Sequence, residues 1–583
     1  MFRRFSLHSC LLALALGSTV WRPLVGLTQD APEAGSSRVE RSSVRTQKYM
    51  VAAANPIAAA AGRDVLRRGG SAIDAAIAVQ MVLGLVEPQS SGVGGGAFLV
   101  YYDAKTKKIR TFDGRETAPS SAQPNRFIGT DGKPLKFYDA VLGGKSVGVP
   151  GVLRMLEQVH KQYGKLPWSQ LFQPAIQRAT TGFPISPRLH TLLSQEKFLG
   201  RSQPARSYFY QPDGTPKPAG ALLVNQQYAN VLRQIATRGA GAFYKGDIAQ
   251  DIVNTVKTAS VPGLTTTDLA RYNSVERPPV CGTYRVYKVC GMGPPTSGGI
   301  TVLQILGMLQ RFNLASLKPD SVQAVHLFAE AGRFAYADRG LYIADPDFLP
   351  VPTNELINPK YLKNRATLIN PNRAFAGEAK PGNPLSQQAL RWGIDDSPEF
   401  PSTSHISIVD GNGNAVAMTT SIEDAFGARL MVRGFLLNNQ LTDFSFSPIT
   451  DGKLVANRVQ ARKRPRSSMA PMMVFDRNGK LVMVVGSAGG PLIINYVAKA
   501  IIGVLDWKLD TQQALSLPNF GNRNGATELE ANTNIANLKP QLEALGHTVT
   551  VREQNSGSQA IVITNQGLIG GVDPRREGLA IGD

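Results

Sequence analysis

The chain has 583 residues, which is long for one ordinary core and favours several domains or one large sandwich. Hydrophobic residues make up 43% and charged residues 18%, a globular composition that excludes a mainly disordered chain. The net charge of +20 suggests an anionic partner, but the charge is spread out and no nucleic-acid-binding motif accompanies it. The densest basic stretch, Arg458 to Arg466, is either a solvated loop or an electrostatic attractant for acidic substrates near a pocket.

The N-terminus has the pattern of a signal peptide. Arg3 and Arg4 precede an apolar run over residues 10–20 that is too short to span a bilayer. We place the signal peptide at residues 1–28, with a retained anchor as the alternative, and expect a flexible polar segment at 29–47. No other stretch has about 18 uninterrupted apolar residues. The sequence therefore predicts an exported protein, periplasmic or extracellular, without a stable membrane span.

Two helices and a strand are predicted next. The Ala-rich segment Pro56–Arg68 has helical periodicity and is followed by a glycine pair. Ser71 is a candidate N-cap for a second helix from Ala72 to about Leu85. The glycine-rich segment from Ser90 then leads out of this helix into an apolar strand, the reverse of a phosphate-binding loop. We interpret it as a site of tight backbone packing.

The middle of the chain offers a possible disulfide and a linker. Cys281 and Cys290 would face each other across a hairpin, and in an exported protein they are either bonded or two buried thiols. Val322–Leu341 is predicted to be a helix in which His326 is a packed residue and not a ligand. Residues 369–402 have linker composition.

From Thr403 onward the sequence becomes rich in strands. Two alternating segments are joined by Asp410-Gly411-Asn412-Gly413, a strong hairpin signal. Further strands are expected downstream, with helices at Pro491–Leu505 and Thr511–Leu517 between them. Periodicity alone predicts only a mixture of α and β structure.

Seven ordered blocks carry a family resemblance. They are GRETAP at 114–119, PPTSGG at 294–299, TSHIS with its hairpin and MTTSIE at 403–423, LLNNQLTDF at 436–444, KRPRSSM at 463–469, GSAGG at 486–490 and DPRREG at 573–578. In these blocks the chain resembles the γ-glutamyltranspeptidases over essentially its whole mature length. The resemblance implies an α+β fold, the four-layer αββα sandwich of N-terminal nucleophile hydrolases. A large subunit, 48–402, and a small subunit, 403–583, would share one core as a heterodimer.

The resemblance marks Thr403 as the nucleophile. A threonine hydroxyl needs a base, and its own α-amine can serve once Thr403 is an N-terminus. The family therefore implies autocatalytic cleavage between Ser402 and Thr403. A γ-glutamyl ester would then form from a donor such as glutathione and pass to water or to an amino-acid or peptide acceptor. Gly489 and Gly490 match the oxyanion hole, and no metal or organic cofactor is implied.

The resemblance also assigns substrate-binding roles at the two ends of an amino acid. Arg115, Ser467 and Ser468 match groups that hold the substrate α-carboxylate. Asp443 matches the acid that pairs with the α-ammonium, and Gln440 is its neighbour. Together these residues would recognise a zwitterion.

Three positions depart from common family patterns. Ser421 stands where many members have a second threonine, so we expect activity at an altered rate. Glu423 stands where many have asparagine, and we expect it to add negative charge beside Asp443. Residues 445–462 correspond to the lid over the pocket and are shorter than in lidded members. The last departure leaves open the balance between hydrolysis and transpeptidation.

Two other functions compete with this interpretation. A cephalosporin acylase of the same superfamily would act on glutaryl side chains that lack the α-amine, and would leave Asp443 without its partner. An inactive amino-acid-binding relative would be expected to lack Thr403 or the glycine pair, and the chain keeps both.

Overall fold

The computed structural model describes residues 38–258, 263–384, 392–395, 400 and 402–583, so the predicted signal peptide lies outside the described residues. The polar segment 29–47 joins the fold earlier than expected. Strand β1 (Val44–Thr46) pairs with β22 (Gly567–Val572) at a sheet edge. Within the described ranges, no helix combines the length and apolar character needed to cross a membrane.

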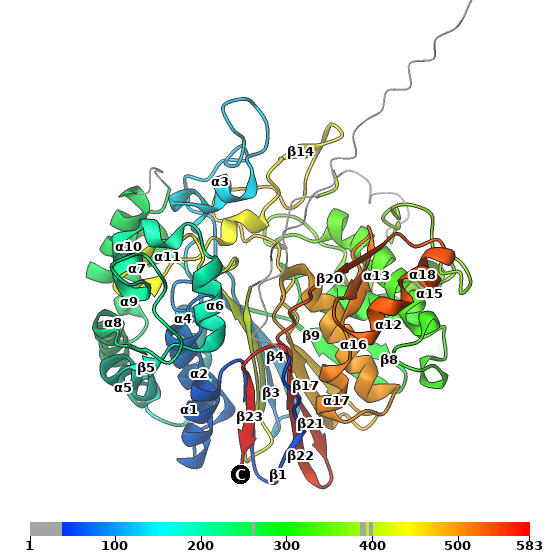
Figure 1. Ribbon diagram of the computed structural model, residues 1–583, viewed down its shortest axis with the longest axis horizontal. Coiled ribbons are helices and arrows are strands. Elements are labelled where there is room, and N and C mark those ends of the chain that lie inside the picture. The colour runs from blue at the N-terminus through cyan, green and yellow to red at the C-terminus, as the bar shows by residue number, and fades with distance from the viewer. Residues whose placement is uncertain (1–37, 259–262, 385–391, 396–399, 401) are drawn as a thin grey trace, which may run out of the picture. The chain divides into compact units, whose positions relative to one another are not determined.

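Two seven-stranded sheets form the centre of the fold (Figure 1). Sheet A contains, in spatial order, β1, β22, β21 (Gln559–Thr564), β17 (Leu481–Gly486), β16 (Met472–Phe475), β9 (Tyr287–Gly291) and β8 (Val280–Tyr284). Sheet B contains β23 (Leu579–Gly582), β2 (Met50–Ala53), β10 (Ser404–Val409), β11 (Ala415–Ser421), β3 (Gly96–Asp103), β4 (Lys108–Gly114) and β7 (Val275–Arg277). Each sheet therefore combines strands from both sides of Thr403.

Helices cover the outer faces of both sheets (Figure 1). Sheet B is covered by α1 (Pro56–Arg67), α2 (Ala72–Val86) and α4 (Val152–Tyr163). Sheet A is covered by α12 (Gly298–Leu309), α16 (Ile493–Leu505) and α17 (Thr511–Ser516). Outside these pack α5 (Gln173–Thr181) and α8 (Gln226–Arg238) on one side and α13 (Val322–Tyr342) on the other. This layering confirms the predicted four-layer sandwich.

Local capping explains where the predicted helices begin. Ser71 Oγ accepts from the Asp74 N–H, and the Asp74 carboxylate accepts from the Ser71 N–H in return. Ser321 caps α13 through the Ala324 N–H. Every residue of α2 is buried, because this helix lies between sheet B and α5, and its sequence is accordingly apolar on all sides.

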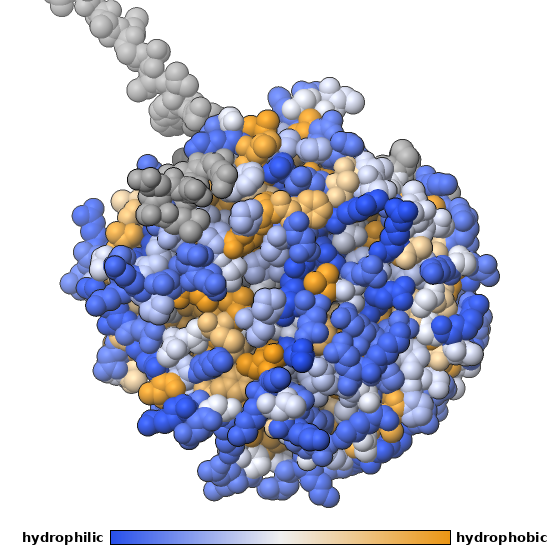
Figure 2. Space-filling model, turned by 180° about the vertical axis from the view of Figure 1, so that it is seen from behind, coloured by the Kyte–Doolittle hydropathy of each residue, from blue (hydrophilic) through white to orange (hydrophobic). Residues whose placement is uncertain are grey.

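The strands β10 and β11 are buried along their whole length, because both of their faces are covered. Ile406 and Ile408 pack into the core beneath the helices on sheet B. His405 and Ser407 point the other way, and Ser407 Oγ donates to the Gln559 carbonyl of sheet A. The surface seen in Figure 2 is, by contrast, largely hydrophilic with separate hydrophobic patches.

The predictions for the middle of the chain are also resolved. Cys281 and Cys290 are partners across the β8–β9 hairpin and form a disulfide with an S–S distance of 2.10 Å. His326 is buried and hydrogen-bonded to His547 and to the Asn370 carbonyl, which confirms a packed residue. The described residues between 369 and 402 form no helix or strand, as expected for a linker.

Candidate active site

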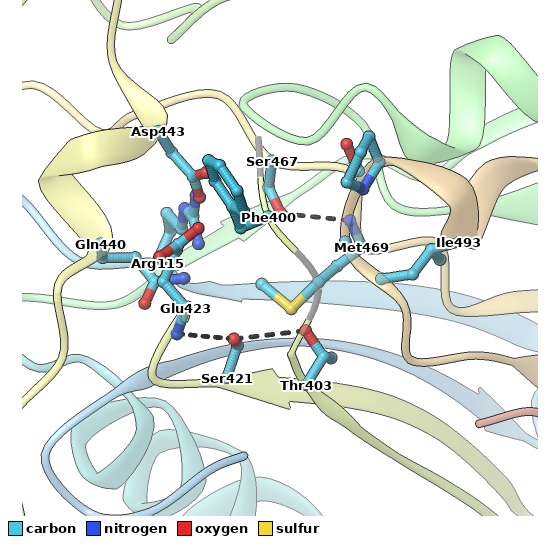
Figure 3. Close-up of a pocket in the computed structure, with 13 residues that line it drawn as sticks. Arg115, Phe400, Thr403, Ser421, Glu423, Gln440, Asp443, Ser467, Met469 and Ile493 are labelled. Atoms are coloured by element: carbon cyan, nitrogen blue, oxygen red, sulfur yellow. Dashed lines mark hydrogen bonds and ion pairs between the residues drawn. The ribbon is translucent and has the colours of Figure 1, made fainter. Parts of the chain in front are cut away.

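The β10–β11 hairpin places two hydroxyl side chains opposite each other. Its turn is closed by Asp410, whose N–H donates to the Asn414 carbonyl at 2.9 Å. Ser404 pairs with Thr420, so the next pair outward is Thr403 and Ser421. Thr403 Oγ1 donates to Ser421 Oγ at 3.3 Å, and the Glu423 N–H donates to the same oxygen at 2.8 Å (Figure 3).

The glycine-rich segment before β3 supports this pair from behind. A Cβ added to Gly94 would lie 2.1 Å from the Leu436 carbonyl oxygen. A Cβ added to Gly95 would lie 2.2 Å from the Ser421 carbonyl oxygen. Only glycine permits such a close backbone approach, which confirms the interpretation of this segment as a site of tight backbone packing.

Thr403 is held in an unusual backbone conformation. Its φ is 124°, in a region that side-chain-bearing residues rarely adopt, with a cost on the order of 1–3 kcal/mol. Thr403 is buried, and Ser402 Oγ donates to the Gln89 carbonyl at 3.1 Å. Because φ of Thr403 is defined by the carbonyl carbon of Ser402, breaking that bond would release the strain.

A small pocket opens in front of Thr403 (Figure 3). It brings together all the predicted catalytic and binding residues except Gly489: Arg115, Thr403, Ser421, Glu423, Gln440, Asp443, Ser467, Ser468 and Gly490. Phe400, Met469, Pro491 and Ile493 complete the lining. The space open to the centre of a water molecule is about 30 Å³, so water can enter this pocket. Figure 3 shows the Phe400 ring between Asp443 and Ser467, within the predicted substrate site.

The residues expected to bind opposite ends of the substrate contact each other in this substrate-free pocket. The fully buried Arg115 forms an ion pair with Asp443. Its Nε also donates to the Pro465 carbonyl at 3.2 Å and its Nη2 to the Arg466 carbonyl at 2.7 Å. The guanidinium is therefore fixed by the segment that leads into Ser467 and Ser468.

The two serines are positioned by neighbouring donors. Ser467 Oγ accepts from the Met469 N–H at 3.1 Å. Ser468 Oγ accepts from Arg339 Nη2 at 2.7 Å, and Arg339 Nε donates to Ser297 Oγ at 2.8 Å. Arg339 was not predicted to belong to the site. The only indication in the sequence was a cation inside the largely apolar segment that forms helix α13.

Glu423 differs from its expected electrostatic role. Burial raises the pKa of its carboxyl well above the usual range, and the nearby Asp443 and Asp424 raise it further. Asn439 Nδ2 donates to the same carboxyl. This shift favours the neutral form of the carboxyl, which is opposite to the negative charge expected beside Asp443.

The glycine pair has backbone conformations that favour glycine at both positions. Gly489 and Gly490 follow β17 and have φ values of 130° and 56°, both in the region that favours glycine. A Cβ on Gly489 would lie 2.5 Å from the ring of Tyr496. Gly490 lines the pocket beside Thr403, where a backbone N–H can serve an oxyanion.

In the basic stretch from Arg458 to Arg466, three basic side chains are buried, whereas Arg462 is exposed. Lys463 donates to the Ala456 carbonyl at 2.6 Å, and burial lowers the pKa of its ammonium to about 7. Arg464 pairs with Asp113 at 3.4 Å, and Arg466 pairs with Asp395 at 3.1 Å. These buried side chains fix the segment that carries Ser467 and Ser468, so of the two alternatives the solvated loop is wrong for them.

The predicted lid segment, residues 445–462, contains a short hairpin of β14 (Ile449–Thr450) and β15 (Lys453–Leu454). From its far end, Asn457 Nδ2 donates to the Asp443 carbonyl at 2.8 Å. The segment is therefore attached to the wall of the pocket at Asp443.

Two further residues were not anticipated: Phe400 in the pocket lining and Glu116 beside Arg115. Glu116 follows Arg115 and is fully buried, and burial raises the pKa of its carboxyl to about 8. A Cβ added to Gly96 would lie 2.4 Å from Glu116 Oε2, so glycine at this position in β3 leaves space for the Glu116 side chain. Phe400 was hidden by the linker composition around it, whereas Glu116 lay within one of the recognised blocks.

Comparison with known proteins identifies the family. The sequence model described as Gamma-glutamyltranspeptidase matches residues 58–583. The chain belongs to the γ-glutamyltranspeptidase family. It is 37% identical to the glutathione hydrolase proenzyme of Bacillus subtilis (strain 168) over 545 residues, 91% of each chain.

Two solved structures are similar to this family member. The cephalosporin acylase of Bacillus halodurans has a TM-score of 0.81 at 27% identity and covers 95% of this chain and 99% of its own. The γ-glutamyltranspeptidase of Helicobacter pylori has a TM-score of 0.56 at 34% identity, covering 60% of this chain and 99% of its own.

Proposed function

We propose that this γ-glutamyltranspeptidase family member cuts its own Ser402–Thr403 bond and then acts as a glutathione hydrolase and γ-glutamyltransferase. One observation carries the proposal. Thr403 precedes β10 in a strained conformation, with its hydroxyl bonded to Ser421 inside a polar pocket. The relative from Bacillus subtilis, named a glutathione hydrolase proenzyme, supports the same function.

Self-cleavage would begin with attack of Thr403 Oγ1 on the Ser402 carbonyl carbon. The C–N bond breaks, an ester forms between the Ser402 acyl group and Oγ1, and the nitrogen leaves as the α-amine of Thr403. Water then hydrolyses the ester, leaving a carboxylate on Ser402 and a free hydroxyl on Thr403. Release of the strain at φ of Thr403 favours this direction.

Turnover would use the same hydroxyl on a γ-glutamyl donor. The new α-amine takes the proton as Oγ1 attacks the γ-carbonyl, and the Gly489–Gly490 backbone stabilises the developing oxyanion. The donor's amine leaves with a proton, which gives a γ-glutamyl ester on Thr403. Water yields glutamate, and an acceptor amine yields a new γ-glutamyl amide.

Donor binding would require a rearrangement of the pocket. The pair formed by Arg115 and Asp443 would open, so that Arg115 meets the α-carboxylate and Asp443 the α-ammonium. The Phe400 side chain would have to move, because its ring lies between Asp443 and Ser467, where the donor would bind. Phe400 precedes the proposed cleavage point by only a few residues, so cleavage frees it to move.

A glutaryl-type acylase is the second candidate, supported by the similarity to the Bacillus halodurans acylase. The two functions differ in the substrate's α-ammonium. Asp443 beside the pocket favours a substrate that carries this cation. Comparing kcat/KM for γ-glutamyl-p-nitroanilide and glutaryl-p-nitroanilide decides between them, and an Asp443→Asn variant should lose activity only toward the first.

The experiment that tests the main proposal is N-terminal sequencing of the purified protein together with a γ-glutamyl hydrolysis assay. We expect a small fragment that begins Thr403-Ser404-His405, and a Thr403→Ala variant that is neither cut nor active. An uncut wild type with full γ-glutamyl hydrolase activity would overturn the mechanism. We further propose that the protein is exported and that both fragments remain together as a heterodimer.

A further inference from the structure

The C-terminal segment Asp573–Gly578 reaches the nucleophile through one of its two arginines. Arg576 lies between β22 and β23, and its side chain is almost fully buried. Its Nη1 donates to the carbonyl oxygen of Thr403 at 3.0 Å, and its Nη2 donates to the Asn555 carbonyl at 3.4 Å. A residue far away in sequence therefore binds the backbone of the nucleophile itself.

The neighbouring backbone leaves space for the Arg576 side chain. A Cβ on Gly557 would lie 2.8 Å from Arg576 Cδ and 2.9 Å from its Nε. Glycine at this position leaves the channel open. The neighbouring Arg575 points elsewhere, pairing with Glu530 at 2.6 Å and with Asp573 at 3.1 Å. The two adjacent arginines thus have separate partners, and only Arg576 contacts Thr403.

The contact matters more once the chain has been cut. Thr403 would then be the first residue of its chain, and the β10–β11 ladder begins only at Ser404. The peptide bond between Ser402 and the Thr403 nitrogen would no longer restrain that nitrogen. A hydrogen bond to its carbonyl would remain to fix the Cα from which both the hydroxyl and the α-amine project.

The charge of Arg576 acts on the same group. A guanidinium is always protonated in proteins, and a cation near an amine disfavours the protonated form of that amine. The α-amine of Thr403 would lie within one residue of the bound carbonyl. The charged groups around it are Arg115 and Asp443 of the pocket. Burial favours the neutral form of two further groups: it raises the pKa of the Glu423 carboxyl and lowers the pKa of His405 on β10 to about 3.

We propose that Arg576 is a positioning residue for the nucleophile, which holds the Thr403 carbonyl and keeps its α-amine in the neutral form that accepts a proton. This inference rests on the proposed function, since it concerns the N-terminal threonine created by cleavage.

The test compares Arg576→Gln and Arg576→Lys in the full chain, with Arg575→Gln as the matched control. In the processed enzymes, kcat/KM for γ-glutamyl-p-nitroanilide is measured across pH 5 to 10. Arg576→Gln removes the charge, so its acid limb should move to higher pH by about one unit. Arg576→Lys keeps the charge, so its limb should stay in place while kcat falls. Arg575→Gln should lower the melting temperature without moving the limb.

An Arg576→Gln enzyme whose acid limb coincides with that of the wild type would overturn the proposal, as would an equal shift in Arg575→Gln. If Arg576→Gln folds but stays uncut, the rate of self-cleavage becomes the measurement. Arg576→Lys should then cut more slowly than Arg575→Gln, and equal rates would contradict the proposal. A wild type that is uncut or inactive would instead reject the proposed function before any variant is compared.

Discussion

Ser421 is the residue whose contribution to the nucleophile is simplest to measure. Its Oγ links Thr403 Oγ1 to the Glu423 backbone N–H, which orients both hydroxyls. Ser421→Ala should therefore reduce kcat for γ-glutamyl hydrolysis about tenfold, the value of roughly one lost hydrogen bond. Ser421→Thr keeps the hydroxyl and should remain active, at an altered rate but without the tenfold loss. Equal losses in both variants would show that packing, and not the hydroxyl, is what Ser421 supplies.

Glu423 gives a prediction about the dependence of stability on pH. Its carboxyl has a raised pKa in the folded chain, so the folded state binds the proton more tightly than the unfolded state. The stability of the wild type should therefore fall as pH rises above the unfolded value of about 4.3. Glu423→Gln cannot ionise, so its melting temperature relative to the parent should increase from pH 4 to pH 8.

The measurement is made in the uncut Thr403→Ala background, so that processing does not confound it. Glu553→Gln is the control, because Glu553 is exposed on the surface. Its effect should be the same at every pH. A Glu423→Gln effect that is flat or shrinks with rising pH would contradict the burial argument.

At the scale of single residues, the sequence predicted which side chains gather at the site but not the contacts between them. The hairpin signal around Asp410 implies the register that sets Ser421 opposite Thr403. The pairing of Arg115 with Asp443 was not predictable, because each was assigned to a substrate group that is absent here. The φ of Thr403 was hidden as well, because it depends on how distant segments hold the backbone.

Among the elements, the glycine segment just before β3 has a structural requirement that can be tested. Gly95 lies against the Ser421 carbonyl at the end of β11, so Gly95→Ala would push these backbones apart. Backbone atoms cannot move aside as a flexible side chain can. We expect slower self-cleavage and a melting temperature lower by roughly 5 °C or more, since overpacking costs about 1–3 kcal/mol.

Gly241→Ala is the matched control for this variant. Gly241 begins α9 (Gly241–Tyr244), and an added Cβ there meets nothing within 4 Å. Its melting temperature and cleavage rate should stay near those of the wild type. A Gly95→Ala protein that matches this control would show that β3 and β11 can separate without harm to the site.

The sequence was most informative about elements with a strong local signal. The bounds of α1 and α2 follow from periodicity and from the capping residue Ser71. It was least informative where tertiary contacts decide, as in the basic stretch that becomes buried through ion pairs with Asp113 and Asp395. Charge patterning alone cannot distinguish a solvated cation from one with a distant partner.

The whole molecule is organised by the interleaving of its two proposed subunits. In sheet B, β10 and β11 lie between β2 and β3, so strands of residues 403–583 are hydrogen-bonded on both sides to strands of residues 48–402. This arrangement was implied by the family resemblance and not by periodicity. Long-range strand order is not encoded in the local pattern of any segment.

This interleaving predicts how the enzyme behaves after denaturation. The uncut Thr403→Ala chain should refold from urea at a rate independent of protein concentration. The cut wild type has lost the link that keeps its fragments at a high effective concentration, so its recovery should rise with concentration and be poor when dilute. Recovery of γ-glutamyl hydrolase activity and of the far-UV spectrum measures this. Equal recovery of the cut enzyme at all concentrations would contradict it.

The single cut therefore changes what stability means for this protein. Before the cut, the chain can unfold and refold as one molecule. After the cut, loss of the hydrogen bonds on both sides of β10–β11 leaves two fragments that must associate again. The useful description of the mature enzyme is then a lifetime set by its unfolding barrier, and not an equilibrium free energy. The active lifetime of such an enzyme is therefore set by the rate at which sheet B opens.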